Sequence, residues 1–257
     1  MSTSLTGRSA LVTGASAGIG RATALDLASR GVRVAVNARR SDKLADLVAE
    51  IEAGGGQAQA FAADAAEPEA IDNLWTEVCA WADGVPEIVV ANAGRGLAGS
   101  VLSSDQEAWE SMFKVNVTGA MRLIRLAANA MRDKLAEADD QFPGADIVVL
   151  GSVVGTNVSP FSGAYGATKF AVEAAAEALR REVGGVGVRV TTIKPGIVIS
   201  EFQGVAGYGE QFDQAVAHFG KMLEPEDVAR SIGYVLEQPP HVHVNTLTIR
   251  PVGMDYP

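Results

Sequence analysis

The sequence predicts an α/β fold: a doubly wound parallel sheet of about seven strands with helices on both faces, formed by residues 1–257 as one domain. Short apolar runs alternate with longer stretches of helical periodicity along the whole chain. Several of these runs are continuous Val, Ile, Leu and Ala, which is typical of strands buried on both faces. No segment rich in Pro, Gly and Ser divides the chain, and 47% of its residues are hydrophobic, enough for a sizeable core.

The expected strands and helices carry their own signals. Ser41 begins a helix that runs toward Gly54–Gly56, a strong C-terminal stop. Ser104 and Glu107 form a capping-box pattern before a long helix. Pro225 lies near the start of another helix, where its missing N–H costs little. The strands are expected at 9–13, 33–37, 57–62, 87–91, 146–151, 188–193 and 246–249.

A glycine-rich loop lies between the first strand and the helix 21–29. Glycines permit a tight turn and let the backbone approach a pyrophosphate, and a helix N-terminus offers N–H groups to it. An ordinary strand-to-helix turn is the alternative, but this position in the fold favours a dinucleotide cofactor. The residues expected to contact the cofactor here are Gly14, Ser16, Gly18, Ile19 and Gly20.

Further motifs follow in order along the chain: Asn92-Ala93-Gly94, Asn116, Ser152, the pair Tyr165 and Lys169, and Pro195-Gly196. With the glycine loop they resemble the short-chain dehydrogenase/reductase family over nearly the whole chain. One small departure is Ala91, where the family often has a second Asn. The resemblance implies a Rossmann-like fold, hydride transfer between a nicotinamide cofactor and a carbonyl or alcohol, and a homotetramer or homodimer. It also implies that the cofactor site includes Asn92, Ala93, Gly94, Tyr165, Lys169, Pro195, Gly196, Val198 and Ser200.

Tyr165 and Lys169 are four residues apart on an expected helix and therefore share a face. A free tyrosine has a pKa of about 10. A nearby ammonium and an oxidised nicotinamide both stabilise the phenolate, so we expect the pKa of Tyr165 to be lowered. Tyr165 would then give a proton to a carbonyl oxygen, or take one from an alcohol.

Ser152 follows a parallel strand, where open α/β sheets place their ligands. The resemblance implies that Ser152 holds the substrate oxygen, that Lys169 also binds the nicotinamide ribose, and that Asn116 holds a water in a proton relay. Taken singly, each has a plainer explanation. Ser152 could be a turn residue, Lys169 could form a surface pair with Tyr165, and Asn116 could cap the backbone locally. Their joint placement favours catalysis.

The end of the second strand predicts NADP(H) as the cofactor. An enzyme that prefers NAD(H), the alternative here, generally places a carboxylate at this strand end to accept from the ribose 2′-OH. This chain has Ala38, Arg39 and Arg40 instead, and a guanidinium suits a phosphate. Asp42 could otherwise neutralise one arginine. By the resemblance Asp64 accepts from the adenine amino group; an Asx turn or a helix N-cap is its alternative.

The segment 197–224 is the expected substrate lid, because glycines would let it move and its apolar residues would enclose a water-poor site. Static packing on the core or on a neighbouring subunit is the alternative. Lys221 is its lone cation apart from His218, which favours a neutral ketone, aldehyde or secondary alcohol with an apolar body. The residues in question are Phe202, Val205, Tyr208, Phe212, Val216, Phe219 and Met222, with Gly204, Gly207 and Gly209.

Composition excludes several other classes. The net charge of -10 argues against a nucleic-acid partner. Apolar runs shorter than the roughly 18 residues of a membrane span, and a polar start without a signal-peptide core, predict a soluble cytoplasmic protein with no membrane partner. Cys79 is the single cysteine, expected to pack rather than react. The three histidines lack metal-ligand spacing, so no metal is expected.

Two rival functions belong to other classes. A regulator that senses a dinucleotide without turning it over would be favoured by loss of Tyr165 or Lys169, and both are present. Epimerases and dehydratases on longer relatives of this fold usually have a differently spaced glycine loop and a larger C-terminal region. The favoured function is therefore an NADP-dependent carbonyl reductase, with an NAD-dependent alcohol dehydrogenase of the same family as the alternative.

Overall fold

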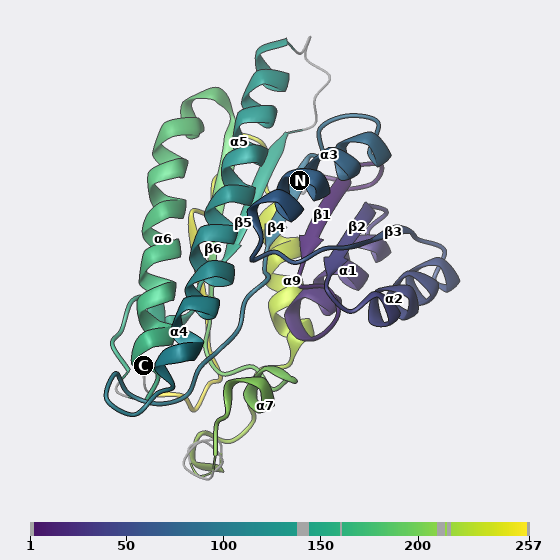
Figure 1. Cartoon of the computed structure of the whole chain (residues 1–257). Coiled ribbons are helices and arrows are strands. Elements are labelled where there is room, and N and C mark those ends of the chain that lie inside the picture. The colour runs from purple at the N-terminus through teal and green to yellow at the C-terminus, as the bar shows by residue number, and fades with distance from the viewer. Residues whose placement is uncertain (1–2, 138–143, 160, 210–213, 215–216, 256–257) are drawn as a thin grey trace.

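The computed structural model describes residues 3–137, 144–159, 161–209, 214 and 217–255. Within them a seven-stranded sheet has the order β3-β2-β1-β4-β5-β6-β7, and every pair of neighbours is parallel (Figure 1). This confirms the predicted sheet. The strands are β1 Ser9–Thr13, β2 Arg33–Ala38, β3 Gln57–Ala62, β4 Ile88–Ala91, β5 Ala145–Leu150, β6 Val188–Pro195 and β7 Thr246–Ile249.

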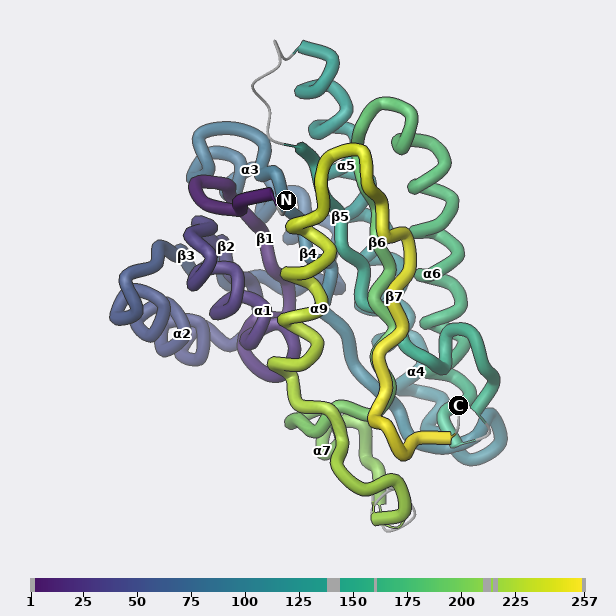
Figure 2. Tube along the Cα trace, turned by 180° about the vertical axis from the view of Figure 1, so that it is seen from behind, coloured from purple at the N-terminus to yellow at the C-terminus, as the bar shows by residue number. Residues whose placement is uncertain are grey.

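Helices cover both faces of the sheet, as predicted (Figures 1 and 2). Successive residues of one strand serve the two faces: Val12 packs in the core under one layer of helices, and Leu11 in the core under the other. The first layer holds α1 Gly18–Ser29, α2 Ser41–Ala53 and α9 Pro225–Leu236. The second holds α3 Pro68–Trp81, α5 Ala120–Glu137 and α6 Gly163–Val183.

The long helix expected after Ser104 is divided. It consists of α4 Gln106–Phe113, a π-helical stretch at Lys114–Gly119, and α5. The capping-box prediction was wrong: the carboxylate of Asp105 caps α4 by accepting from Glu107 N–H at 2.9 Å. The Ser104 hydroxyl accepts from Trp109 Nε1 instead, because that indole folds back over the first turn. A capping box does occur at α9, between Glu224 and Asp227.

Cys79 lies on α3, half-buried against the core of the second layer. Burial raises the pKa of its thiol to about 11. Because the thiolate is the reactive form, this cysteine packs and does not act as a nucleophile near neutral pH.

The edge formed by the carboxyl ends of the strands positions the site. The glycine loop leaves β1 there, and the short helices at Val153–Gly155 and α7 Phe202–Ala206 follow β5 and β6. In Figure 1, α7 lies beyond this edge of the sheet, below the other helices. Among the described helices, none combines the length and apolar character needed to cross a membrane.

Candidate active site

A cleft of about 1660 Å³ opens along this edge of the sheet. Of the residues predicted for catalysis and cofactor binding, all of which the structure describes, only Gly20 and Asn116 are absent from its walls. Segments that are distant in sequence meet in the cleft because parallel strands end on the same side. The predicted residues that line it are Gly14, Ser16, Gly18, Ile19, Arg39, Arg40, Asp64, Asn92, Ala93, Gly94, Ser152, Tyr165, Lys169, Pro195, Gly196, Val198 and Ser200.

The glycine loop has the features of a pyrophosphate cradle. A Cβ on Gly20 would lie 2.4 Å from the Gly14 carbonyl oxygen, so only glycine lets α1 pack this closely under the loop. Asn92 fixes the loop from β4 by donating to Thr13 O at 2.8 Å. Within the described structure no side chain caps the start of α1, and its first turn holds no acidic residue. Such a helix end offers N–H groups and a positive dipole to an anion.

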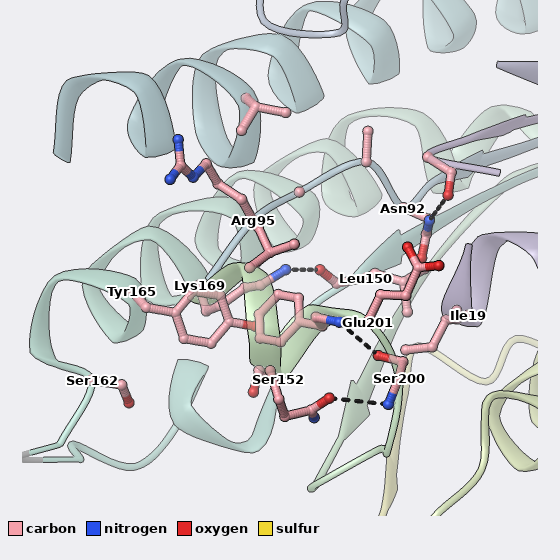
Figure 3. A pocket seen from close by; sticks show the side chains of 18 of the residues that line it. Ile19, Asn92, Arg95, Leu150, Ser152, Ser162, Tyr165, Lys169, Ser200 and Glu201 are labelled. Carbon is pink, nitrogen blue, oxygen red and sulfur yellow. Dashed lines mark hydrogen bonds between the residues drawn. The ribbon is translucent and has the colours of Figure 1, made fainter. Parts of the chain in front are cut away.

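Tyr165, Lys169 and Ser152 come together at the centre of the cleft (Figure 3). Tyr165 and Lys169 lie on the first turns of α6, and Ser152 begins the short helix after β5. The Ser152 side chain lies close enough to the Tyr165 hydroxyl to lower its pKa. Lys169 Nζ lies 5.7 Å from the centre of the Tyr165 ring and donates to Leu150 O at 2.6 Å.

The acidity of Tyr165 differs from the sequence-based expectation. Burial raises the pKa of its hydroxyl well above the ordinary value, and the neighbouring Tyr208 raises it further. The nearby Ser152 side chain acts in the opposite direction but does not offset the loss of water. Burial also lowers the pKa of Lys169, to about 8. In the protein alone, Tyr165 is therefore protonated near neutral pH.

Asn116 lies beneath the cleft and is 2% exposed. Its Oδ1 accepts from Arg95 N–H at 2.8 Å, and its Nδ2 donates to Arg95 O at 2.9 Å and to Thr168 Oγ1 at 3.0 Å. It sits in the π-helical stretch between α4 and α5. Its side chain thus ties that stretch to the loop after β4 and to α6, one residue before Lys169.

The two arginines after β2 make different ion pairs, and neither involves Asp42. Arg39 is 77% exposed and lies 3.7 Å from Asp64, whose carboxylate also accepts from Ala66 N–H as an Asx turn. Arg40 donates to Ser16 Oγ at 3.1 Å and to Glu201 Oε2 at 3.0 Å. One guanidinium therefore joins the glycine loop to the segment that precedes α7.

The segment after β6 covers the other end of the cleft. The Phe202 ring lies 5.6 Å from the Tyr165 ring, between their centres. Tyr208 hydrogen-bonds to Ser162, and Phe219 packs against Val153, Val154 and Met254. Val205 is 63% exposed, whereas Met222 is buried. Phe212 and Val216, also assigned to this lid by the sequence, lie outside the described residues.

Four residues that the sequence analysis passed over contribute to the site. Arg95 and Gly96 follow Asn-Ala-Gly, and Arg95 lines the cleft. Glu173 lies four residues after Lys169, a spacing that places it on the same helix face and would have identified it. Lys194, just before Pro195, carried no comparable signal. In the described part of the chain, no group of three or more His, Cys, Asp or Glu is placed to hold a metal.

The fold and the cleft are those of a dinucleotide-dependent oxidoreductase, and comparison with known proteins specifies the class. Residues 8–209 match the family model of the short chain dehydrogenases. An uncharacterized oxidoreductase of Staphylococcus saprophyticus is 34% identical over 95% of this chain and 97% of its own length. Dehydrogenase/reductase SDR family member 11 of Bos taurus is 35% identical, covering 95% and 96%. The chain belongs to the short-chain dehydrogenase family and is an oxidoreductase.

A solved structure agrees with this assignment. The alcohol dehydrogenase from the archaeon Thermococcus sibiricus, complexed with 5-hydroxy-NADP, superposes with a TM-score of 0.83 at 26% identity. The match covers 97% of this chain and 99% of that one. The similarity therefore extends over nearly the whole chain.

Proposed function

We propose that the protein is an NADP(H)-dependent carbonyl reductase that acts on a ketone or aldehyde with an apolar body. The observation that carries the proposal is the partly buried Tyr165, which keeps its proton while facing Ser152 in the cleft. When bound, NADPH supplies a hydride to the carbonyl carbon. Tyr165 gives its proton to the carbonyl oxygen, which becomes far more basic than a phenolate as the bond order falls.

Ser152 and Lys169 support this proton transfer. The Ser152 side chain, which lies near the Tyr165 hydroxyl, would hold the substrate oxygen beside it. The Lys169 ammonium stabilises the phenolate that remains and would donate to the nicotinamide ribose. A raised tyrosine pKa favours donation over abstraction near neutral pH, which supports reduction as the working direction.

The proposed cofactor preference is supported by the end of β2. The cleft is lined there by Ala38, Arg39 and Arg40, and none of these residues carries a carboxylate. Arg40 is already held against Ser16 in the glycine loop, so its guanidinium needs little ordering to meet a 2′-phosphate. The Thermococcus sibiricus relative was solved with an NADP derivative.

The proposed substrate class is supported by the apolar walls beside the catalytic hydroxyls. Phe202, Phe219 and Val153 line this part of the cleft. Arg95 adds a cation to the wall, but in Figure 3 its guanidinium points away from the Tyr165 ring and Ser152. Its Nη1 donates to Ser111 Oγ at 3.1 Å on α4. A neutral carbonyl with an apolar body fits the surface that remains.

A substrate panel tests this function. The oxidation of NADPH, followed by its absorbance, is measured with aldehydes and ketones in matched pairs, each neutral compound beside its carboxylated counterpart. We expect turnover of neutral apolar carbonyls, with the carboxylated partners slower. Turnover of carboxylated members alone would contradict the substrate class, and an absence of NADPH oxidation with every aldehyde and ketone would contradict the function.

Substitution of Gly96 tests whether the segment after β6 closes over the substrate. A Cβ on Gly96 would lie 2.5 Å from Phe202 Cζ and 2.7 Å from Ala206 Cβ, so Gly96→Ala pushes α7 away from Tyr165. Overpacking of this kind costs about 1–3 kcal/mol. We expect a KM for the carbonyl raised about fivefold or more, with little change in cofactor affinity.

Gly204→Ala is the matched control, because a Cβ there meets no atom within 4 Å. It should leave KM near the wild-type value. Hydrogen exchange gives a second readout: substrate with cofactor should protect residues 202–209, and cofactor alone should protect Gly14–Gly20 more strongly. Full protection of 202–209 in the free protein, with Gly96→Ala unchanged in KM, would instead favour static packing.

A further inference from the structure

Behind Ser152 lies a buried carboxylate, Glu173 on α6, which is 8% exposed. Its Oε1 accepts from the Ser152 backbone N–H at 3.0 Å. Its Oε2 lies 2.8 Å from Lys194 Nζ, near the end of β6. The same ammonium donates to Thr156 Oγ1 at 2.8 Å. One ion pair thus joins the helix of Tyr165, the strand end of Ser152 and the strand that leads to the cofactor residues Pro195 and Gly196.

The surrounding backbone leaves the carboxylate little freedom. A Cβ on Gly155 would lie 1.9 Å from Glu173 Oε1, and a Cβ on Gly151 would lie 2.5 Å from the same atom. The oxygen therefore occupies space that two glycines leave open, directly on either side of Ser152 and its short helix. Lys194 is also largely shielded, with 17% of its side chain exposed.

Stability alone does not explain such a pair. Burying two charges costs desolvation that their attraction often fails to exceed, and apolar replacements of both partners are frequently neutral. The pair instead has a specific contact, the hydrogen bond to the residue whose hydroxyl meets Tyr165. Neither member lines the cleft, so both act through other residues.

We propose that Glu173 and Lys194 form a buried ion pair that positions Ser152 and sets the pH range in which Tyr165 exchanges its proton. The proposal rests on the proposed roles of Tyr165 and Ser152. Glu173 and Lys194 are positioning residues: the carboxylate fixes the Ser152 backbone, and the ammonium balances its charge.

The charges around Tyr165 make the pair testable. The charged and titratable groups near Tyr165 are Lys169 and Glu173 on its own helix and Tyr208 after α7. Lys194 on β6 pairs with Glu173, and Arg95 and Glu201 lie on the cleft wall. The Glu173 charge raises the pKa of Tyr165 and of Lys169 alike. Lys194 carries the opposite charge beside it. Neutralising one member therefore leaves the other uncompensated, with opposite effects.

Two single variants separate positioning by charge from a merely structural role. The measurement is kcat/KM against pH for alcohol oxidation by NADP⁺, where the tyrosine must first lose its proton. In Glu173→Gln the uncompensated positive charge of Lys194 favours the Tyr165 phenolate. The rising limb of the pH profile of kcat/KM therefore moves to lower pH. In Lys194→Gln the unbalanced Glu173 opposes it, so the limb moves to higher pH. Each shift should be about half a pH unit or more, and the double variant should return near the wild-type position.

Glu173→Leu tests the hydrogen bond separately. The Gln side chain keeps an oxygen that accepts from Ser152 N–H, whereas Leu has none. The Glu173→Leu variant should therefore lose about tenfold or more in kcat, with KM little changed. The Glu173→Gln variant should retain most of the wild-type kcat. If single variants fail to fold by circular dichroism, the apolar double variant Glu173→Leu with Lys194→Met carries this test. A kcat near the wild-type value in this double variant would overturn the proposal.

The failures of this inference and of the proposed function are distinguishable. An absence of NADP(H)-dependent turnover in the wild-type protein contradicts the function itself. Normal wild-type turnover, with both single variants moving the pH limb in the same direction or not at all, overturns the role of the ion pair and leaves the function standing.

Discussion

Tyr165→Phe is expected to reduce turnover by at least the ~10²-fold typical of losing a general acid. The phenylalanine keeps the ring that packs 5.6 Å from Phe202, so the cleft should retain its shape. It removes the hydroxyl that meets Ser152 and the carbonyl oxygen. The affinity for NADPH, measured by fluorescence titration, should remain within a few-fold of wild type, because the loss concerns the chemical step.

Tyr234→Phe is the matched control for this substitution. Tyr234 lies on α9 and is 54% exposed, outside the walls of the cleft. Its turnover should equal that of the wild type. A folded Tyr165→Phe variant that turns over like the Tyr234→Phe control would show that another group donates the proton.

Ala38→Asp is expected to move the cofactor preference by about two orders of magnitude toward NADH. In the wild type, charge-assisted hydrogen bonds from arginine to a 2′-phosphate contribute about 1.5–3 kcal/mol. This corresponds to roughly 10- to 150-fold in affinity. The new carboxylate would accept from a ribose 2′-OH, repel the phosphate and compete for Arg39, so the three effects act in one direction. The measurement is the ratio of kcat/KM for NADPH to that for NADH.

Ala38→Asn separates the charge from the size of the new side chain. Asn has nearly the shape of Asp but no charge, so it should retain a preference for NADPH. Removing Arg39 together with Ala38→Asp should strengthen the change. Equal ratios for the Asp and Asn variants would contradict the electrostatic account and indicate a steric effect.

The sequence was sufficient for the sheet and for most of the cleft. The bounds of β1, β3 and β7 coincide with those of the predicted strands. The continuous apolar runs in β4 and β5 form strands that are buried along their whole length, as expected for a parallel sheet. The separated motifs meet because parallel strands end on one edge. The places of Ser152 and the glycine loop follow from the strand ends, whereas Tyr165 was identified by its spacing to Lys169 and by the resemblance to the family.

The sequence could not reveal features that depend on packing between distant segments. The pKa of Tyr165 in the protein alone is raised by burial, which involves the segment after β6. The sequence-based expectation of a lowered pKa considered only the charges of Lys169 and an oxidised nicotinamide. The pairing of Arg40 with Glu201 joins residues 161 positions apart. The capping of α4 by Asp105 rather than Ser104 depended on where the Trp109 indole packs.

The most direct test of the account is the ratio of kcat/KM for NADPH and NADH, measured for the wild-type protein with one shared carbonyl substrate. The same experiment tests carbonyl reduction and the role of Arg39 and Arg40. We predict reduction with a preference for NADPH of roughly 10- to 150-fold, from the hydrogen-bond free energy of a 2′-phosphate. A preference for NADH would contradict it, leaving Arg39 and Arg40 with no role beyond their ion pairs with Asp64 and Glu201.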